Sequence, residues 1–203
     1  MQSIFGYTNT TNILSKDGIV KNNMPLQNRN KIARSAKECA YLAVFVALVI
    51  ALQTALSILP GVELITVMFV AYSFTLGVKR GMIAATAFSL LRQMVFGAYP
   101  TVLVLYLIYF NLLTVCFGVL GKLIKNPLKW LVIIVFTACV CTLCFTLIDN
   151  IITPLWLGYD RRSATLYFKA SLPFMIPQVV CTAISVATLF YPLHKTFKTL
   201  KIK

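Results

Sequence analysis

Long apolar runs, each near the length of a membrane-spanning helix, constrain this chain more than any other feature. Six such runs cover residues 36–59, 63–78, 81–97, 101–120, 130–153 and 172–193. About 20 apolar residues in a helix cross the ~30 Å hydrocarbon core of a bilayer. The runs are continuously apolar, whereas the strands of a membrane barrel alternate with a period of two. The sequence therefore predicts transmembrane helices.

The composition argues against an ordinary soluble domain. Hydrophobic residues make up 59% of the 203 residues and charged residues only 12%, about half the charged fraction of soluble proteins. The short connections at 60–62, 79–80 and 98–100 make successive helices antiparallel neighbours. We predict an all-α membrane protein, a compact bundle of six transmembrane helices over residues 31–203. A polar, mobile N-terminal tail is expected over residues 1–30.

Basic residues predict the orientation of the bundle. The N-terminal tail, the loops near 79–80 and 122–129 and the C-terminus all face one side, and they carry most of the Lys and Arg residues. The opposite side has only Arg161, Arg162 and Lys169. Cytoplasmic loops are enriched in Lys and Arg, so we predict that both termini are cytoplasmic. The net charge of +14 then reflects topology and affinity for the lipid surface, and no nucleic-acid partner is expected.

Motifs for catalysis and nucleotide binding are missing from the sequence. It contains no Gly-rich phosphate loop with Lys, no H-E-x-x-H and no G-x-S-x-G. The six cysteines lie in or beside apolar runs, where thiols pack as small hydrophobes. His194 is interpreted as an anchor at the membrane interface. We expect no enzymatic activity, no cofactor and no metal, so that active transport would draw its energy from another protein.

Charged and amide side chains gather toward the outer half of the predicted bundle. Glu63 opens the second run, Arg92 lies five residues before Gly97 in the third, and Asp149 and Asn150 occupy the outer part of the fifth. Buried charge in a membrane costs several kcal/mol unless it is paired or hydrated, which makes these residues functional candidates. An ion pair of Arg92 with Asp149 or Glu63 that only holds helices together is the structural alternative.

Polar stripes at helical spacing follow the last two runs. One stripe contains Thr142, Thr146, Asn150 and Thr153, and the other contains Ser171, Gln178, Thr182 and Ser185. We predict that the stripes face one another. Hydrogen bonds between helices would explain them as well as a ligand site would, and the sequence leaves both interpretations open.

Aromatic residues complete the candidate site. Tyr106, Phe110 and Asn111 form a semi-polar patch on the fourth run, and Tyr99 lies in an outer loop, where an aromatic belt at the lipid interface would also explain it. The candidate substrate-binding residues share polar or aromatic side chains in the outer half of the bundle: Glu63, Arg92, Tyr99, Tyr106, Asn111, Asp149, Asn150 and Gln178.

Small residues recur every four positions in the first run, at Ala43, Ala47 and Ala51. This spacing makes a smooth groove on which another helix can pack, either inside the bundle or in a partner. With the chain size, the six runs and the segment Pro60-Gly61-Val62-Glu63-Leu64-Ile65, the pattern over about residues 36–203 resembles the S-components of energy-coupling factor (ECF) transporters. These proteins capture vitamins and other micronutrients in bacteria and archaea.

The resemblance implies both a function and partners. The alanine face would dock on a transmembrane coupling protein that two cytoplasmic ATPases drive, in a bacterial or archaeal plasma membrane. The substrate pocket would open outward between the later helices and the outer loops 60–62, 98–100 and 154–171. The expected function is the capture of a small water-soluble vitamin or related micronutrient. The alternatives are a self-sufficient small secondary carrier and a structural or assembly membrane protein without a ligand.

The chemistry of the ligand stays open at the level of sequence. Arg92, Arg161 and Arg162 suit a carboxylate or phosphate, whereas Asp149 and Glu63 suit an amine or a ring nitrogen. Aromatic side chains suit a flat ring. Many vitamins fit this description.

Overall fold

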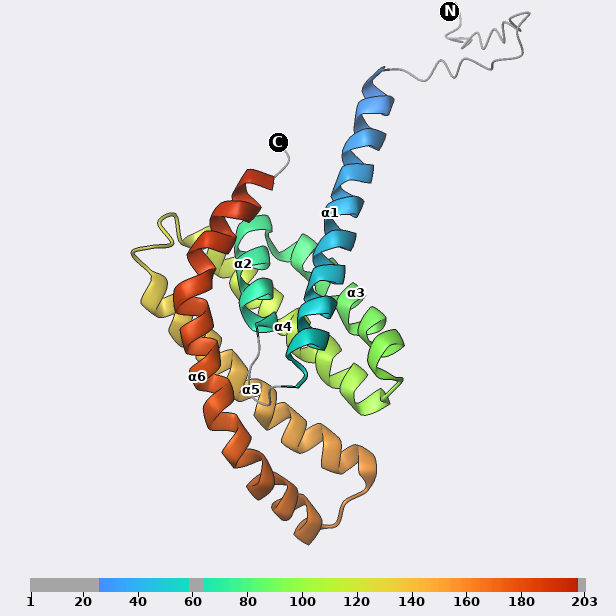
Figure 1. Cartoon of the computed structure of the whole chain (residues 1–203), viewed down its shortest axis with the longest axis vertical. Coiled ribbons are helices and arrows are strands. Elements are labelled where there is room, and N and C mark those ends of the chain that lie inside the picture. Colours follow the sequence, from blue (N-terminus) through green and yellow to red (C-terminus); the bar gives the residue numbers. More distant parts are fainter. Residues whose placement is uncertain (1–25, 59–63, 201–203) are drawn as a thin grey trace, which may run out of the picture. The chain divides into compact units, whose positions relative to one another are not determined.

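The computed structural model describes residues 26–58 and 64–200, with side chains over 35–58 and 64–199 (Figure 1). The described residues form helices and turns, without a strand, which confirms the prediction of an all-α protein. The helices are α1 (Leu26–Leu56), α2 (Ile65–Leu76), α3 (Val78–Phe96), α4 (Pro100–Leu123), α5 (Leu131–Leu157) and α6 (Arg161–Leu200).

The chain divides into two units, Met1–Lys37 and Glu38–Lys203. The first contains all of the predicted tail. Residues 1–25 of this tail lie outside the described part, and residues 26–30 belong to α1. Every contact described below lies in the second unit, which we call the helical unit.

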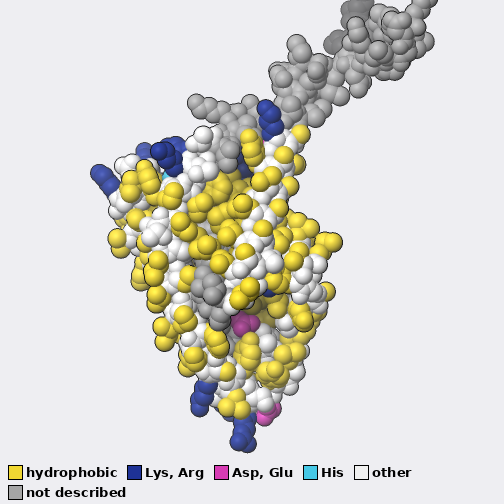
Figure 2. Space-filling view, in the orientation of Figure 1, with side chains coloured by type: hydrophobic (Ala, Val, Ile, Leu, Met, Phe, Trp, Pro, Cys, Tyr) yellow, Lys and Arg dark blue, Asp and Glu magenta, His cyan; other side chains and the backbone are white. Residues whose placement is uncertain are grey.

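Within the described residues, four helical segments are long and apolar enough to cross a membrane. They are Ser35–Leu56, Pro100–Leu123, Leu131–Leu157 and Arg161–Thr199. On the face shown in Figure 2, hydrophobic side chains cover the helical unit between two groups of Lys and Arg side chains. Exposed apolar side chains such as Val132 and Phe136 are typical of a protein whose surroundings are lipid rather than water.

The two remaining helices differ from the predicted spans. α2 has 12 residues, which at about 1.5 Å per residue extend over ~18 Å, short of the ~30 Å hydrocarbon core. α3 has 19 residues and includes Lys79, Arg80 and Arg92. The prediction that every apolar run forms a full-length membrane-spanning helix is therefore wrong for α2.

α2 forms the core of the helical unit. Every residue from Ile65 to Thr75 is buried, and α2 contacts α3, α4, α5 and α6. From α1, the ring of Phe45 stacks on Tyr72 with centroids 4.0 Å apart. A helix that is apolar on all sides is stable only when neighbours surround it, so burial explains the composition of α2 without a membrane span.

Polar contacts join the helices at the end of the unit where α2 turns into α3. Arg80 of α3 pairs with Glu38 of α1 at 2.6 Å. Nδ1 of His194 lies 2.8 Å from the Thr75 hydroxyl, and its ring stacks on Phe190. His194 therefore packs against the central helix α2. The sequence had predicted an anchor at the membrane interface.

Glycines allow α4 to approach the turn between α2 and α3 closely. A Cβ on Gly118 would lie 2.7 Å from the backbone nitrogen of Val78, and one on Gly121 would collide with the carbonyl oxygen of Phe74. The neighbouring atoms are backbone, which cannot move aside as a flexible side chain can. Helix α4 packs at this distance only because these residues lack a side chain.

Gly118→Ala is expected to lower the stability of the helical unit by about 1–3 kcal/mol, because the added methyl group forces two helices apart. The measurement is the thermal unfolding midpoint of the purified protein in mild detergent. Val119→Ala is the matched control, because Val119 is on the exposed face of the same helix. Equal unfolding midpoints for Gly118→Ala and wild type would contradict the close approach of α4.

The connection between α5 and α6 is much shorter than predicted. A loop over 154–171 and a last helix over 172–193 were expected, but α5 runs to Leu157 and α6 begins at Arg161. Gly158 supplies the left-handed turn, with φ of 65°. Asp160 caps α6 by accepting a hydrogen bond of 3.1 Å from the Ser163 N–H. Hydrogen bonds from the side chain and the backbone N–H of Ser163 hold the pKa of the Asp160 carboxyl below its usual range.

The error has a physical cause. The predicted loop began at Pro154, yet Pro154 lies inside α5, and α6 contains Pro173, Pro177 and Pro192. A proline removes one backbone hydrogen bond and favours a kink. Both helices nevertheless continue through these positions while α6 packs against α5 and α2 (Figure 1).

Candidate functional site

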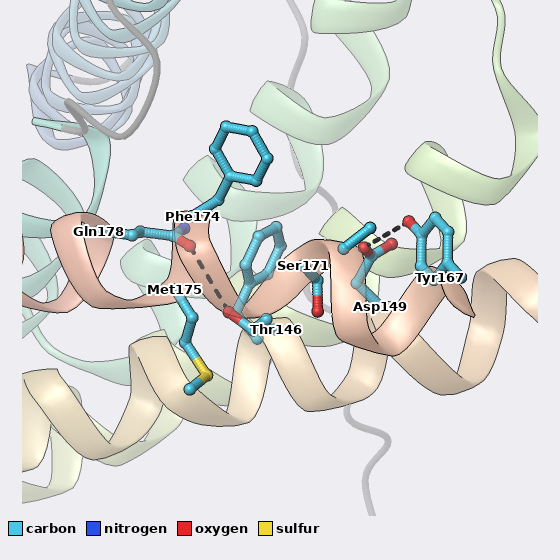
Figure 3. Close-up of a pocket in the computed structure, with 9 residues that line it drawn as sticks. Thr146, Asp149, Tyr167, Ser171, Phe174, Met175 and Gln178 are labelled. Carbon is cyan, nitrogen blue, oxygen red and sulfur yellow. Dashed lines mark hydrogen bonds between the residues drawn. The ribbon is translucent and has the colours of Figure 1, made fainter. Parts of the chain in front are cut away.

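A cavity of about 350 Å³ lies between α5 and α6 (Figure 3). This volume is in the range of pockets that hold small molecules. Its lining combines aromatic rings, hydroxyl groups, an amide and a carboxylate, from Phe145, Thr146, Asp149, Tyr167, Ala170, Ser171, Phe174, Met175 and Gln178. The cavity is thus an apolar pocket with a few polar groups, which is the usual composition of a ligand site.

Helical spacing explains why these side chains meet. Phe145 and Asp149 are four residues apart on α5, and Tyr167, Ser171 and Gln178 follow at intervals of four and seven on α6. Residues at such intervals share one face of a helix. Because α5 and α6 are antiparallel neighbours across a short turn, the two faces lie opposite each other and enclose the cavity.

Asp149 is the charged group of the cavity. Its Oδ1 accepts a hydrogen bond of 2.7 Å from the Thr153 hydroxyl, and its Oδ2 accepts one of 2.9 Å from the Tyr167 hydroxyl. Both carboxyl oxygens therefore act as hydrogen-bond acceptors. Among the described residues, the only ion pair joins Arg80 and Glu38, so Asp149 has hydroxyl partners and no cationic one.

The predicted polar stripes do face one another across the α5–α6 contact. The hydroxyls of Thr142 and Thr182 are 3.1 Å apart, and the Thr146 hydroxyl is 3.5 Å from Oε1 of Gln178. This part of the prediction is confirmed. Thr142 and Thr182 are buried and do not line the cavity, so their role is to join the two helices. Thr146 and Gln178 join the helices and also line the cavity.

Asn150 supports the cavity without lining it. Its Nδ2 donates a hydrogen bond of 2.9 Å to Oγ of Ser171, which does line the cavity. Its Oδ1 is buried and has no hydrogen-bond partner in the described part of the chain. Asn150 thus orients the hydroxyl of Ser171.

Arg92 belongs to a second polar cluster, formed by α1, α3 and α4. Its Nε donates to Oε1 of Gln53 at 3.1 Å, and its guanidinium lies 4.4 Å from the ring centroid of Tyr106. Gln53 in turn donates to the Tyr106 hydroxyl at 3.2 Å. The alternative of an Arg92–Asp149 ion pair is wrong, because each group has other partners. Glu63, the other possible partner, lies outside the described residues.

An aromatic contact lies between this cluster and the cavity. The ring centroids of Tyr106 and Phe145 are 6.0 Å apart, and Phe145 lines the cavity. Tyr106 is therefore adjacent to a wall of the cavity without lining it.

Two other candidates lie away from the cavity. Tyr99 is 61% exposed, and its backbone N–H donates to Oε1 of Gln93. Asn111 donates a hydrogen bond of 2.8 Å to the carbonyl oxygen of Leu107. It also contacts the Thr86 hydroxyl, and this contact joins α4 to α3. Of the eight predicted residues, Asp149 and Gln178 line the cavity.

Sequence reasoning missed Tyr167, the hydroxyl donor to Asp149, together with Phe174 and Met175. Tyr167 was missed because residues 154–171 were assigned to a loop, where helical periodicity is not sought. Phe174 and Met175 lie in the predicted sixth run, where an apolar side chain gives no polar signal. The signal was present, because Tyr167 precedes Ser171 by four residues and so extends the stripe of α6 by one turn.

The alanine face of α1, formed by Ala43, Ala47 and Ala51, is exposed. The opposite face of α1 carries Phe45, Val46 and Val49, which are buried against the core. Within the described residues the alanines therefore do not pack inside the bundle, which removes one of the two explanations for the pattern.

Comparisons of this chain with protein-family models, curated proteins and solved structures found no match. The described residues contain no group of three or more His, Cys, Asp or Glu side chains that could hold a metal ion. The structure defines the class: an all-α protein with four helices able to cross a membrane and a cavity between α5 and α6.

Proposed function

We propose that this chain is the substrate-capture subunit of an ECF-type importer in a bacterial or archaeal plasma membrane. It binds a small water-soluble vitamin or related micronutrient from outside. It delivers the ligand through a partner module made of a transmembrane coupling protein and two cytoplasmic ATPases. The observation that carries the proposal is the α5–α6 cavity, whose lining includes a carboxylate with hydroxyl partners only.

The position of the cavity in the chain supports capture from outside. We propose a six-helix membrane bundle with both termini cytoplasmic, in which the short helix α2 is enclosed by the other helices, so that the turn Gly158–Asp160 faces outward. Tyr167 and Asp149 lie on the α6 and α5 segments next to this turn. A ligand arriving from the aqueous phase then meets the cavity in the outer half of the bundle.

The exposed alanine face supports a membrane partner. Ala43, Ala47 and Ala51 have small side chains and face away from the core of the helical unit. A face of small residues lets a second helix approach closely, which is how helices associate in a bilayer. The absence of a nucleotide motif from the sequence is consistent with ATPases in separate subunits.

The proposal predicts that the full chain, purified in mild detergent, retains a small molecule that mass spectrometry identifies. Ala170→Phe places a ring in the cavity lining and is expected to lower the bound amount by about tenfold or more, equivalent to about 1.4 kcal/mol of binding free energy. The matched control is Ala187→Phe, an exposed alanine on α6 outside the cavity.

The same measurement discriminates between functions. A structural membrane protein without a ligand would yield no bound small molecule from either variant or from wild type. Equal amounts from Ala170→Phe and Ala187→Phe would place the ligand elsewhere and contradict the role of the α5–α6 cavity.

A further inference from the structure

We propose that the α5–α6 cavity binds an organic cation, such as an ammonium group or a positively charged ring nitrogen, with Asp149 as its counter-ion. The inference rests on the proposed function of the cavity as a ligand site, and it narrows the ligand to one charge class. It also selects between the two kinds of charge that the sequence left open.

The charge balance of the cavity carries the inference. Asp149 is the only charged side chain among the described residues that line the cavity. A carboxylate in a membrane-spanning segment costs several kcal/mol unless an opposite charge or water compensates it. The hydroxyls of Thr153 and Tyr167 satisfy one lone pair on each oxygen but bring no positive charge. A ligand cation supplies the charge that the lining lacks.

The arginine that could have neutralised Asp149 is held elsewhere. Nε of Arg92 donates a hydrogen bond to Gln53, and the guanidinium lies over the rings of Tyr106 and Phe96, at 4.4 and 4.7 Å from their centroids. The other basic side chains near this end of α6, Arg161, Arg162 and Lys169, are exposed and do not line the cavity. The described structure therefore leaves Asp149 available to a ligand.

The aromatic lining fits a cation better than an anion. Rings of Phe145, Tyr167 and Phe174 line the cavity, and the negative face of an aromatic ring attracts a cation by about 0.5–2 kcal/mol. In Figure 3 the Tyr167 hydroxyl points at Asp149, and the Thr146 hydroxyl points at Gln178. The Tyr167 hydroxyl, together with that of Thr153, keeps the carboxylate oriented. An anionic ligand would meet the repulsion of Asp149, and the described residues of the lining include no cationic group to offset it.

Three small probes that differ mainly in charge test the inference: phenethylammonium, phenethyl alcohol and phenylacetate. Binding of each to the full chain, stripped of any retained molecule, is measured by isothermal titration calorimetry in mild detergent. We expect phenethylammonium to bind with a Kd at least about tenfold lower than the other two. Equal or tighter binding of the neutral or the anionic probe to wild type would overturn the inference.

Variants of Asp149 test whether this residue is the source of the selectivity for a cation. Asp149→Asn keeps the size of the side chain and is expected to remove the preference for the cation, whereas Asp149→Glu is expected to retain it. Asp160→Asn is the matched control, because Asp160 is an exposed carboxylate in the turn before α6 and asparagine caps a helix equally well. Unchanged cation selectivity in a folded Asp149→Asn protein would overturn the assignment of Asp149.

Failure of this inference is distinguishable from failure of the proposed function. If a neutral or anionic molecule co-purifies with wild type and is lost in Ala170→Phe, the capture function stands and the cation assignment fails. If no molecule co-purifies and no probe binds, both proposals fail. If a cationic molecule co-purifies and is lost in Asp149→Asn, both are supported.

Discussion

Replacing Ala43, Ala47 and Ala51 together by leucine is expected to abolish association with the proposed ATPase module while leaving the α5–α6 cavity able to bind its proposed ligand. The three side chains are exposed on one face of α1. Larger side chains on this face hold a partner helix at a greater distance, and helix pairs in a membrane depend on close contact. We expect about a tenfold or greater loss of co-purified ATPase, measured after affinity purification of the tagged chain.

A single pair of variants controls for the added volume. Ala47→Leu changes the proposed docking face, and Ala187→Leu makes the same change at an exposed alanine of α6. Only Ala47→Leu is expected to weaken the association. Full co-purification of the triple leucine variant with the coupling protein and ATPases would disprove the assignment of α1 as the docking helix.

Phe69→Ala is expected to destabilise the helical unit by about 3–5 kcal/mol. The side chain is fully buried. Its ring contacts Phe45 of α1, Phe88 of α3 and Phe110 of α4, at centroid distances of 5.5, 5.3 and 4.8 Å. Removing the ring leaves a void at the junction of four helices, because α2 cannot collapse into it without losing its contacts with the others. The measurement is equilibrium unfolding in mixed detergent micelles.

Phe136→Ala makes the same chemical change at the surface of α5, where the ring is 68% exposed. If the surroundings are lipid or detergent, the apolar environment fills the space that the ring leaves, and little stability is lost. We therefore expect the two variants to differ by about 2 kcal/mol or more. Similar losses for Phe69→Ala and Phe136→Ala would contradict the central position of α2.

The polar residues show how far a one-dimensional pattern can predict a site. Thr146 and Gln178 were selected because residues at helical spacing share a face, and their side chains do meet across α5 and α6. Asp149 was selected because charge is costly in lipid, and it lines the cavity. Both arguments use local rules that hold in any packing arrangement.

The partners of the charged residues could not be predicted in the same way. Arg92 and Asp149 have opposite charges and occupy the same half of the predicted bundle, which made an ion pair a reasonable alternative. Their actual partners, Gln53 and Tyr167, depend on which helices are neighbours. Charge and depth constrain which groups need a partner, but helix packing selects it.

The sequence by itself determined that the chain is helical and apolar and which residues share a helix face, because helix periodicity and the cost of unpaired backbone groups in lipid depend only on local order. The tertiary structure decided that α2 is a short buried core helix, that α5 and α6 continue through their prolines to a three-residue turn, and that the alanine face of α1 stays uncovered. Each of these features depends on contacts between segments far apart in the chain. The same proline can lie inside a helix or end it, and the same apolar run can span a membrane or form a buried core helix, according to what packs against it.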